Sequence, residues 1–459
     1  MNSLEPIAFE PDRARVARVG RALAGVPRAA YSVPHVYPSA APAFEQAPMA
    51  ERPQLLGDEL RLYVHIPYCR YRCTFCYFAV RVGAGHDAMA RYVAALEQEL
   101  DWLPPGKGLS QLFVGGGTPT ALPPELLERV LAAVQARTTR HPDKANVHTI
   151  ETSPETISTE HVDAFRRHGV GRVSMGVQSL DEEVLDTVHR DQTALGAIEA
   201  CELLVDSGLI VNIDLIYGLP GQKPADVRSD LERLARLGVP SFTLYSLRVT
   251  ERTSVRHRLG DDRFDLARLM SWRAFVKQAA EDLGYTQTRW HTFKRLDTVA
   301  SRHERLPCFD DDMRGYQLGV GMSARSHLGR TVYRNHEIHD RYVDRIETRQ
   351  SPVEQVFPLA EEDLMTQFVA RSLGDGRPLA RAGYEATFGR PIDADFGDVL
   401  ARLRDGGLVV DDGEVIALSD GGALLYDLVT LAFYPERARA WLAEREEKAS
   451  FITLTAVPG

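Results

Sequence analysis

The amino-acid sequence predicts an α/β fold organised around a parallel sheet. Short apolar strands alternate with amphipathic helices from Leu62 onward, and six such units follow one another. This alternation is typical of βα repeats, which place parallel strands side by side. Six units favour a partial (β/α)6 barrel over a closed barrel of eight strands.

Each unit joins one expected strand to one expected helix. The strands are Leu62–Ile66, Leu112–Val114, Val147–Glu151, Arg172–Gly176, Ile210–Ile216 and Phe242–Leu247. The helices are Ala88–Leu103, Pro124–Arg137, Thr159–His168, Leu195–Ser207, Pro224–Leu237 and Leu266–Leu283. Chemically active residues stand at the ends of the first five strands, in the order Cys69, Gly115, Glu151, Gln178 and Asp214. Because ligands bind at the carboxyl ends of the strands in parallel barrels, we expect these residues to meet on one face.

Three regions are expected along the chain: an irregular N-terminal extension at 1–58, the core at 59–350, and a small winged-helix-like domain at 351–459. The extension holds one candidate helix, Val16–Leu23, and then prolines that interrupt regular hydrogen bonding. The stretch Tyr31–Tyr37 either packs outside the core or helps to close an active site.

The last region begins with a predicted linker, Pro352–Leu359. A pattern of helix, helix, small β-hairpin and helix follows, over Glu361–Leu373, Asp393–Arg404, Val409–Ala417 and Gly421–Ala432. Winged-helix modules often bind DNA, but this one lacks a stripe of basic residues. A lid or substrate-holding role is therefore preferred.

Composition limits the possible partners. The chain has 459 residues, 44% of them hydrophobic, and a net charge of −10. Phosphate surfaces attract proteins rich in Lys and Arg, so we expect neither nucleic acid nor a bilayer as a nonspecific partner. No apolar run is long enough to span a membrane, and no secretory signal is expected. A reducing cytoplasm suits the free thiols.

Three of the five cysteines, Cys69, Cys73 and Cys76, form a C-x3-C-x2-C pattern after the first strand. Three thiolates on one short loop are able to hold three irons of a [4Fe–4S] cluster. The fourth iron then stays open for a chelating ligand such as the amino and carboxylate groups of S-adenosylmethionine (SAM). A zinc site lacks its second ligand pair, a disulfide lacks an oxidising compartment, and buried structural thiols rarely share one polar loop.

The motifs around this loop resemble those of the radical SAM superfamily, and specifically of the HemN-like family of oxygen-independent coproporphyrinogen III oxidases. They are YVHIPYC, FVGGGTPT, ETSPE, VSMGVQSLDEEVL, NIDLIYGLPGQ and LGVGMSARS, and they occur in the family's order. The resemblance implies that a first SAM contacts Tyr63, Gly116, Glu151, Tyr245 and Arg325. It implies a second SAM at Phe75, Gly117, Thr118, Gln178, Arg190 and Asp214. Without the resemblance, the residue types favour a different interpretation of Arg190 and Asp214, in which the two side chains form a structural ion pair.

One position favours a particular branch of this family. The oxidases carry a further cysteine where this chain has Phe78, and the haem-chaperone branch reads C-x-x-C-D-F where this chain reads CYF. The resemblance therefore points to the class C methyltransferases and cyclopropanases, which use two SAM molecules to pass a one-carbon unit to an sp2 carbon. The expected substrate is an unsaturated or aromatic small molecule, either free or held on a carrier, with flavodoxin or ferredoxin as electron donor. The alternatives are a coproporphyrinogen III dehydrogenase and a haem chaperone.

Other residues receive weaker expectations. A flat substrate's pocket could include Trp290, His291, Phe293, Tyr316, Arg325 and His327. Histidines 336 and 339 in RNHEIH are expected to be solvated rather than to bind metal, and Cys201 and Cys308 are expected to be structural.

Overall fold

The fold is built on a curved sheet whose central strands are parallel. The computed structural model describes residues 12–27, 57–249, 253–255 and 266–444, and Tyr31–Tyr37 lies outside these ranges. The six central strands are β1 (Glu59–Ile66), β4 (Lys107–Gly116), β6 (His148–Thr152), β7 (Val170–Gln178), β8 (Ile210–Tyr217) and β9 (Ser241–Ser246). They lie in this order, each parallel to the next. The α/β prediction is confirmed.

Alternation along the strands separates an outer from an inner face. On β1, Leu60, Leu62, Val64 and Ile66 are fully buried and join the main apolar core. Because successive side chains on a strand point to opposite faces, Arg61, Tyr63 and His65 point the other way, toward the inside of the barrel.

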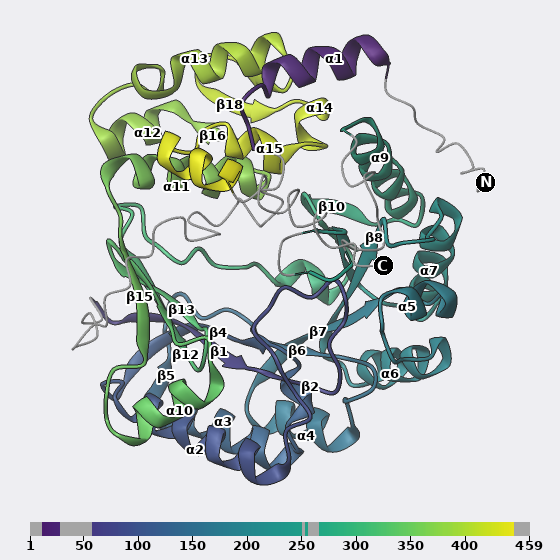
Figure 1. Cartoon of the computed structure of the whole chain (residues 1–459), viewed down its shortest axis with the longest axis vertical. Coiled ribbons are helices and arrows are strands. Elements are labelled where there is room, and N and C mark those ends of the chain that lie inside the picture. The colour runs from purple at the N-terminus through teal and green to yellow at the C-terminus, as the bar shows by residue number, and fades with distance from the viewer. Residues whose placement is uncertain (1–11, 28–56, 250–252, 256–265, 445–459) are drawn as a thin grey trace, which may run out of the picture.

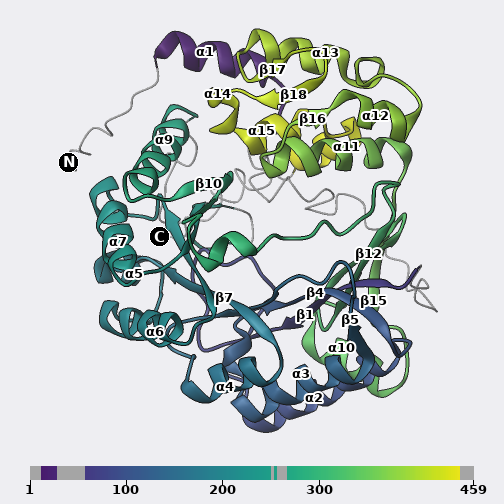
Figure 2. The same cartoon turned by 180° about the vertical axis from the view of Figure 1, so that it is seen from behind.

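Helices cover the outer face (Figures 1 and 2). They are α2 (His86–Asp101), α3 (Pro124–Arg137), α4 (Thr159–Arg167), α6 (Ala194–Asp206), α7 (Pro224–Arg236) and α9 (Leu266–Asp282). Side chains at helical spacing, such as Leu127, Val130 and Val134 of α3, pack in the same core as β1. Three shorter elements, β5 (Thr138–Arg140), η1 (Pro119–Ala121) and α5 (Glu182–Thr187), fill the connections.

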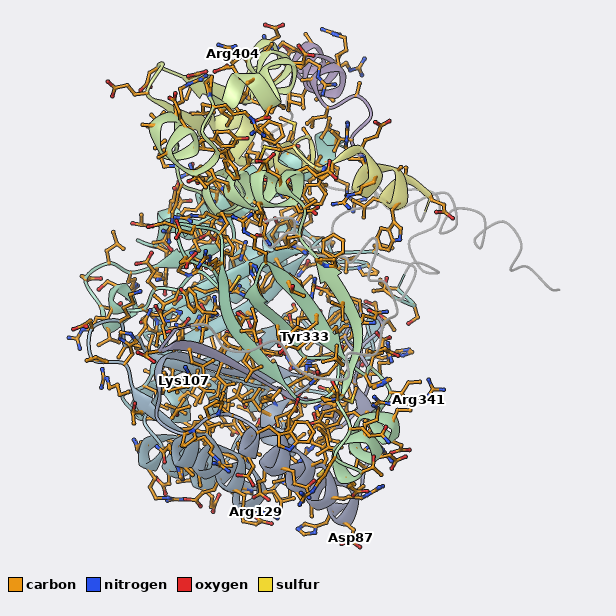
Figure 3. All side chains as sticks on the ribbon, turned by 90° about the vertical axis from the view of Figure 1, so that its left-hand side faces the viewer. Asp87, Lys107, Arg129, Tyr333, Arg341 and Arg404 are labelled. Atoms are coloured by element: carbon orange, nitrogen blue, oxygen red, sulfur yellow. The ribbon has the colours of Figure 1, made fainter. Side chains whose placement is uncertain are left out.

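The sheet continues beyond the six predicted strands at both edges and reaches 13 strands. Antiparallel β11 (Thr292–Lys294) and β10 (Thr286–Arg289) follow β9. Beside β1 lie parallel β12 (Gly315–Val320) and then antiparallel β13 (Arg325–Gly329), β14 (Thr331–Asn335) and β15 (Val353–Pro358). Figure 3 looks onto this layer, in which the label marks the buried Tyr333.

The predicted linker at Pro352–Leu359 is wrong, because this stretch forms the edge strand β15. Its ladder with β14 runs from Val353 opposite Asn335 to Pro358 opposite Thr331. Pro352 lies just before the strand and Pro358 ends it, which are positions that tolerate proline at the edge of a sheet.

The region after β15 forms a separate layer at the top of Figure 1. Its elements are α11 (Glu361–Ser372), η3 (Leu373–Asp375), β16 (Leu379–Ala380), α12 (Arg381–Phe388), α13 (Ile392–Asp405), β17 (Val409–Asp411), β18 (Val415–Leu418), α14 (Asp420–Ala423) and α15 (Tyr426–Leu431). The strands pair in the order β16-β18-β17. Three elements, η3, β16 and α12, escaped prediction, and the expected helix Gly421–Ala432 is divided into α14 and α15.

Helix α1 (Arg13–Ala22) packs on this top layer and also contacts α9 of the barrel. Its Val19 and Ala22 share an apolar core with Leu400 and Leu403 of α13. The fit is close, since a Cβ added to Gly406 would lie 2.4 Å from the Cβ of Ala22. The N-terminal helix is therefore part of the packing of the C-terminal region (Figure 1).

A buried ion pair joins the top layer to the barrel. Arg273 of α9 donates to both oxygens of Asp427 in α15, at 2.8 and 2.6 Å. A second contact runs from Trp290 Nε1 to the carbonyl oxygen of Leu373, at 2.9 Å. Among the described residues, no helix is both long and apolar enough to cross a membrane.

Candidate functional site

The three predicted cluster cysteines lie on one loop at the carboxyl end of β1. Two short strands, β2 (Tyr68–Cys69) and β3 (Arg81–Val82), pair in parallel and bring the ends of this loop together. The backbone N–H of Arg81 donates to the carbonyl oxygen of Pro67 at 2.8 Å. Residues 69–82 therefore form a loop, called the cysteine loop below, whose two ends are joined. The β2–β3 pairing that joins them is the base of this loop.

The cysteine thiols act on one another. Burial raises the pKa of Cys69 to about 12, a hydrogen bond with Thr118 opposes this, and Cys76 and Cys73 raise the pKa further. Burial also raises the pKa of Cys73 and of Cys76. A bound metal reverses this preference, because a cation stabilises the thiolates that coordinate it. The donor set fits an iron–sulfur cluster.

The glycine turn after β4 packs directly against this loop. The N–H of Gly117 donates to Ile66 and that of Thr118 to Tyr68, both at 2.7 Å. Gly116 has φ +117°, and a Cβ there would lie 2.6 Å from the ring of His65. A Cβ on Gly117 would lie 2.7 Å from the carbonyl oxygen of Tyr68. Only glycine allows this approach.

Two half-buried carboxylates, Glu151 on β6 and Asp214 on β8, lie inside the barrel, and the charge of Asp214 acts on Glu151. Burial, and next Asp214, raise the pKa of Glu151 to about 7, although its Oε2 accepts from the N–H of Gly116 at 3.1 Å. Burial raises the pKa of Asp214 to about 6, and its oxygens accept from Asn212 at 2.7 Å and Ser174 at 3.1 Å. A positively charged ligand such as an ammonium group would stabilise the ionised form of these two carboxylates, whose pKa values burial has raised.

Arg190 lies beside the cysteine loop. Its Nη1 lies 3.7 Å from Cys73 Sγ, its Nε donates to Gln192 at 2.9 Å, and its Nη2 donates to the carbonyl oxygen of Gly176. Its acidic partner is Glu155, at 3.7 Å. The ion pair with Asp214 that the residues alone favoured is therefore wrong.

Most of the remaining predicted cofactor residues surround the same space. Burial and then the charge of Glu151 raise the pKa of Tyr63, while burial, then Asp214 and then Glu151 raise the pKa of Tyr245. Gln178 has φ +71°, in the left-handed region, and its Nε2 lies 2.7 Å from where a Cβ on Gly176 would be. Phe75 packs in a small apolar group with Val184, Val188, Leu219 and Val255.

Arg325 occupies a different surrounding on β13. Burial, and then the charge of Arg334, lower its pKa to about 10, while Cys308 opposes the shift. Cys308 Sγ in turn lies 3.9 Å from Nδ1 of His327. Arg325 and Cys308 thus lie on the β12–β13 side of the sheet.

The residues of the expected aromatic pocket lie in different surroundings. His291 stacks on Tyr245 with ring centroids 5.3 Å apart, and Trp290 stacks on Tyr426 of the top layer at 6.0 Å. Phe293, in contrast, is buried in the main core. Tyr316 donates to the carbonyl oxygen of Pro307, so it lies on the Cys308 side together with His327.

Sequence reasoning missed Arg248, which follows β9. Its Nη1 is buried and has no hydrogen-bond partner among the described residues. Tyr77 of the cysteine loop, Tyr426 and Asp427 act electrostatically on it, and Arg248 follows burial among the causes that lower the pKa of His291 to about 3. A lone arginine after a strand carries no motif, so the sequence held no signal for it.

Comparison with known proteins agrees with this geometry. Residues 63–234 match the model of the radical SAM superfamily. The oxygen-independent coproporphyrinogen III oxidase of Escherichia coli is 29% identical over 398 residues, which cover 82% of this chain and 85% of that protein. The heme chaperone HemW of Bacillus subtilis is 25% identical over 381 residues, which cover 82% of this chain and 99% of that protein.

A solved structure shows the same fold. It is that of coproporphyrinogen III oxidase (HemN) from Escherichia coli, described as a radical SAM enzyme, with a TM-score of 0.70 and 24% identity. The match covers 94% of this chain and 96% of that one.

These relatives overturn the expected methyl transfer or cyclopropanation, because they are named as oxidases and chaperones. That expectation depended on Phe78, whose side chain is 49% exposed and stacks on Tyr77 with ring centroids 4.6 Å apart. An exposed aromatic residue beside the ligand set is weak evidence for a change of reaction.

Proposed function

We propose that this chain, which carries a radical SAM domain within the fold of the Escherichia coli oxidase, removes carboxyl groups from a tetrapyrrole with propionate side chains, such as coproporphyrinogen III. It would use one [4Fe–4S] cluster and two SAM molecules. Radical SAM enzymes need an electron donor, and flavodoxin or ferredoxin would serve here.

The observation that carries this proposal is the environment of Arg248. A buried guanidinium with an unpartnered Nη1 has a strong preference for an anion, and a carboxylate satisfies it with a charge-assisted hydrogen bond. Tyr77 of the cysteine loop is among the groups acting on Arg248, so a carboxylate held here would lie near that loop. The stacked rings of Tyr245 and His291 beside it suit a flat ligand.

A second cation, Arg305, acts electrostatically on Glu151. Arg305 is exposed, and it acts on the pKa of Glu151 and of Tyr63 in the lowering direction. A substrate with several propionates could engage Arg248 and Arg305 together. A neutral substrate would use neither charge.

The cofactor residues divide the remaining work. Cys69, Cys73 and Cys76 would bind three irons, and Glu151 would accept a hydrogen bond from the ammonium group of the first SAM. When bound, cluster and SAM supply a 5′-deoxyadenosyl radical that removes a hydrogen atom. The chain would position SAM and substrate close together, so that the radical meets the intended hydrogen atom.

The test is an anaerobic assay of reconstituted protein with SAM, a reductant and coproporphyrinogen III. Removal of a hydrogen atom and of carbon dioxide from a propionate leaves one electron, so the assay also supplies a one-electron acceptor. We then expect 5′-deoxyadenosine, carbon dioxide and a product with vinyl groups. Arg248→Gln should raise KM about 10- to 100-fold, the equivalent of one lost charged hydrogen bond. Arg295→Gln is the control, because Arg295 lies over Tyr285 at the opposite end of β9. Absence of carbon dioxide with wild-type protein would refute the proposal.

One finding favours a second candidate, a haem-binding chaperone: the match to the Bacillus subtilis protein covers 99% of that protein. Haem titration followed by the Soret band separates the two candidates. Tight stoichiometric haem binding without decarboxylation would select the chaperone.

A further inference from the structure

His339 connects the two ends of the cysteine loop although it lies far away in the sequence. It is the first residue of α10 (His339–Glu347), and its side chain is only 10% exposed. Its Nε2 lies 2.9 Å from the hydroxyl of Tyr68, the residue before Cys69. Its Nδ1 contacts Nη1 of Arg81, which pairs with Tyr68 across β2 and β3.

The hydroxyl of Tyr68 fixes the direction of the Nε2 contact. It donates to the carbonyl oxygen of Ala88 at 3.2 Å, so it accepts from Nε2–H of His339. Nδ1 of His339 lies between Arg81, which only donates, and Oδ1 of Asp340, which accepts, at 2.7 Å. Asp340 also accepts from Arg81 at 2.7 Å and holds the guanidinium in place. Burial lowers the pKa of His339, and the hydrogen bond with Asp340 opposes this shift.

Packing keeps the imidazole in this position. Its ring stacks on Tyr92 with centroids 5.3 Å apart and planes 24° apart. The hydroxyl of Tyr92 donates to the carbonyl oxygen of His65, at the end of β1, at 2.8 Å. The base of the cysteine loop therefore has a rigid support on the side of α2 and α10.

We infer that His339 is a positioning residue that holds the base of the cysteine loop closed and so slows the loss of the cluster. Within the described residues, the ends of the loop are also held by the short β2–β3 pairing, by the bond from Arg81 N–H to Pro67, and by a contact of 3.3 Å between Nε2 of His65 and the carbonyl oxygen of Ala79. If both ends separate, Cys69 moves away from Cys73 and Cys76, and one iron loses its ligand. The inference rests on the cluster assignment in the proposed function.

Three substitutions separate the two contacts from the packing. His339→Gln keeps a donor that can reach Tyr68, and His339→Asn keeps an acceptor for Arg81. His339→Phe keeps a ring against Tyr92 but loses both hydrogen bonds. The control is Asp344→Ala on the same helix, which removes a 2.9 Å ion pair with Arg91 and leaves the loop untouched.

The measurement is the rate of iron release from anaerobically reconstituted protein to a chelator. We expect about a tenfold faster release for His339→Phe, intermediate rates for His339→Gln and His339→Asn, and a wild-type rate for Asp344→Ala. A wild-type rate in His339→Phe with faster release in the other two would overturn the inference, because it would assign the effect to packing alone.

Alkylation of the iron-free protein by iodoacetamide supplies an independent readout. Cys69 should react faster in His339→Phe than in wild type, as measured by mass spectrometry. If wild-type protein takes up no iron while this difference persists, the cluster assignment fails and the support by His339 stands. Equal alkylation rates in both proteins would overturn the support itself.

Discussion

The Nη1 atom of Arg190 lies 3.7 Å from the Sγ atom of Cys73. One residue predicted to hold the second SAM thus contacts one predicted ligand of the cluster. Glu155, which accepts from Tyr71 at 2.7 Å, lies on the other side of the same guanidinium. The charge beside the cysteine is therefore set by an arginine and a glutamate together.

Substitution of Arg190 should change the reduction potential of the cluster. Arg190→Gln removes a positive charge, so the reduced cluster becomes harder to form and the midpoint potential in an EPR-monitored titration falls. Glu155→Gln should shift it in the opposite direction. Iron content should stay at the wild-type level in both. Unchanged potentials would show that Arg190 acts on SAM alone, which equilibrium binding of SAM would then report.

Cys73→Ala should abolish the cluster. Two thiolates are insufficient to hold three irons, so the visible absorption of the reconstituted protein and all cleavage of SAM should be lost. Cys201→Ala is the control, because Cys201 is a buried core residue on α6. Retained cluster absorption in Cys73→Ala would contradict the ligand assignment.

Gly117→Ala should displace the cysteine loop. The new Cβ would lie 2.7–2.8 Å from backbone atoms of Pro67 and Tyr68, which cannot move without moving Cys69. We expect about 1–3 kcal/mol of destabilisation from this overpacking and a lower iron content. Gly85→Ala has no atom within 4 Å of its new Cβ and should behave as wild type. Thermal unfolding and iron analysis check both.

Glu151→Gln should stabilise the cofactor-free protein at pH 8 while weakening SAM binding. The pKa of Glu151 in the folded protein, about 7, exceeds its ordinary value of 4.5. The folded state therefore holds more protons than the unfolded state between these pH values, and stability falls as pH rises through them. At pH 8 the free energy of unfolding of Glu151→Gln should exceed that of wild type by at least about 1.4 kcal/mol, the equivalent of one pKa unit. At pH 4 the two proteins should have the same free energy of unfolding. Urea unfolding at both pH values measures it.

Asp427→Ala should destabilise the chain by about 3–5 kcal/mol, because it leaves the Arg273 charge buried and unpaired. The double change Arg273→Met with Asp427→Leu should recover most of this loss. Asp344→Ala breaks an exposed pair and should cost under about 1 kcal/mol. Urea unfolding measures all three. A loss in Asp427→Ala no larger than in Asp344→Ala would contradict the role of the buried pair.

The core of the fold was accessible from sequence because each strand there carries its own apolar pattern. The expected strand at Ile210–Ile216 and helix at Pro224–Leu237 differ from β8 and α7 by one residue each. Strand β15 was not accessible in the same way. Its few residues between prolines acquire strand structure only through pairing with β14, which no local pattern encodes.

The site was accessible to the extent that it lies in motifs. The cysteines, the glycine turn and Glu151 belong to continuous stretches, and the structure brings these together. His339 contacts Arg81 across 258 positions, and Arg248 is defined by the absence of a partner for Nη1. Both depend on where distant strands and helices meet, so neither could be recognised before the fold was known.

The packing of α1 on α13 has a consequence for synthesis. The ribosome makes α1 about 370 residues before α13, whose Leu400 and Leu403 share its core. At a synthesis rate of about 5–20 residues per second, roughly 20 to 75 s pass between the synthesis of Val19 and Ala22 and that of Leu400 and Leu403. During this interval the barrel is able to fold and offers α1 its contacts with α9, whereas the contacts of α1 with α13 are still missing. A translational pause before α13 would prolong the exposure of that small apolar surface to chaperones and proteases.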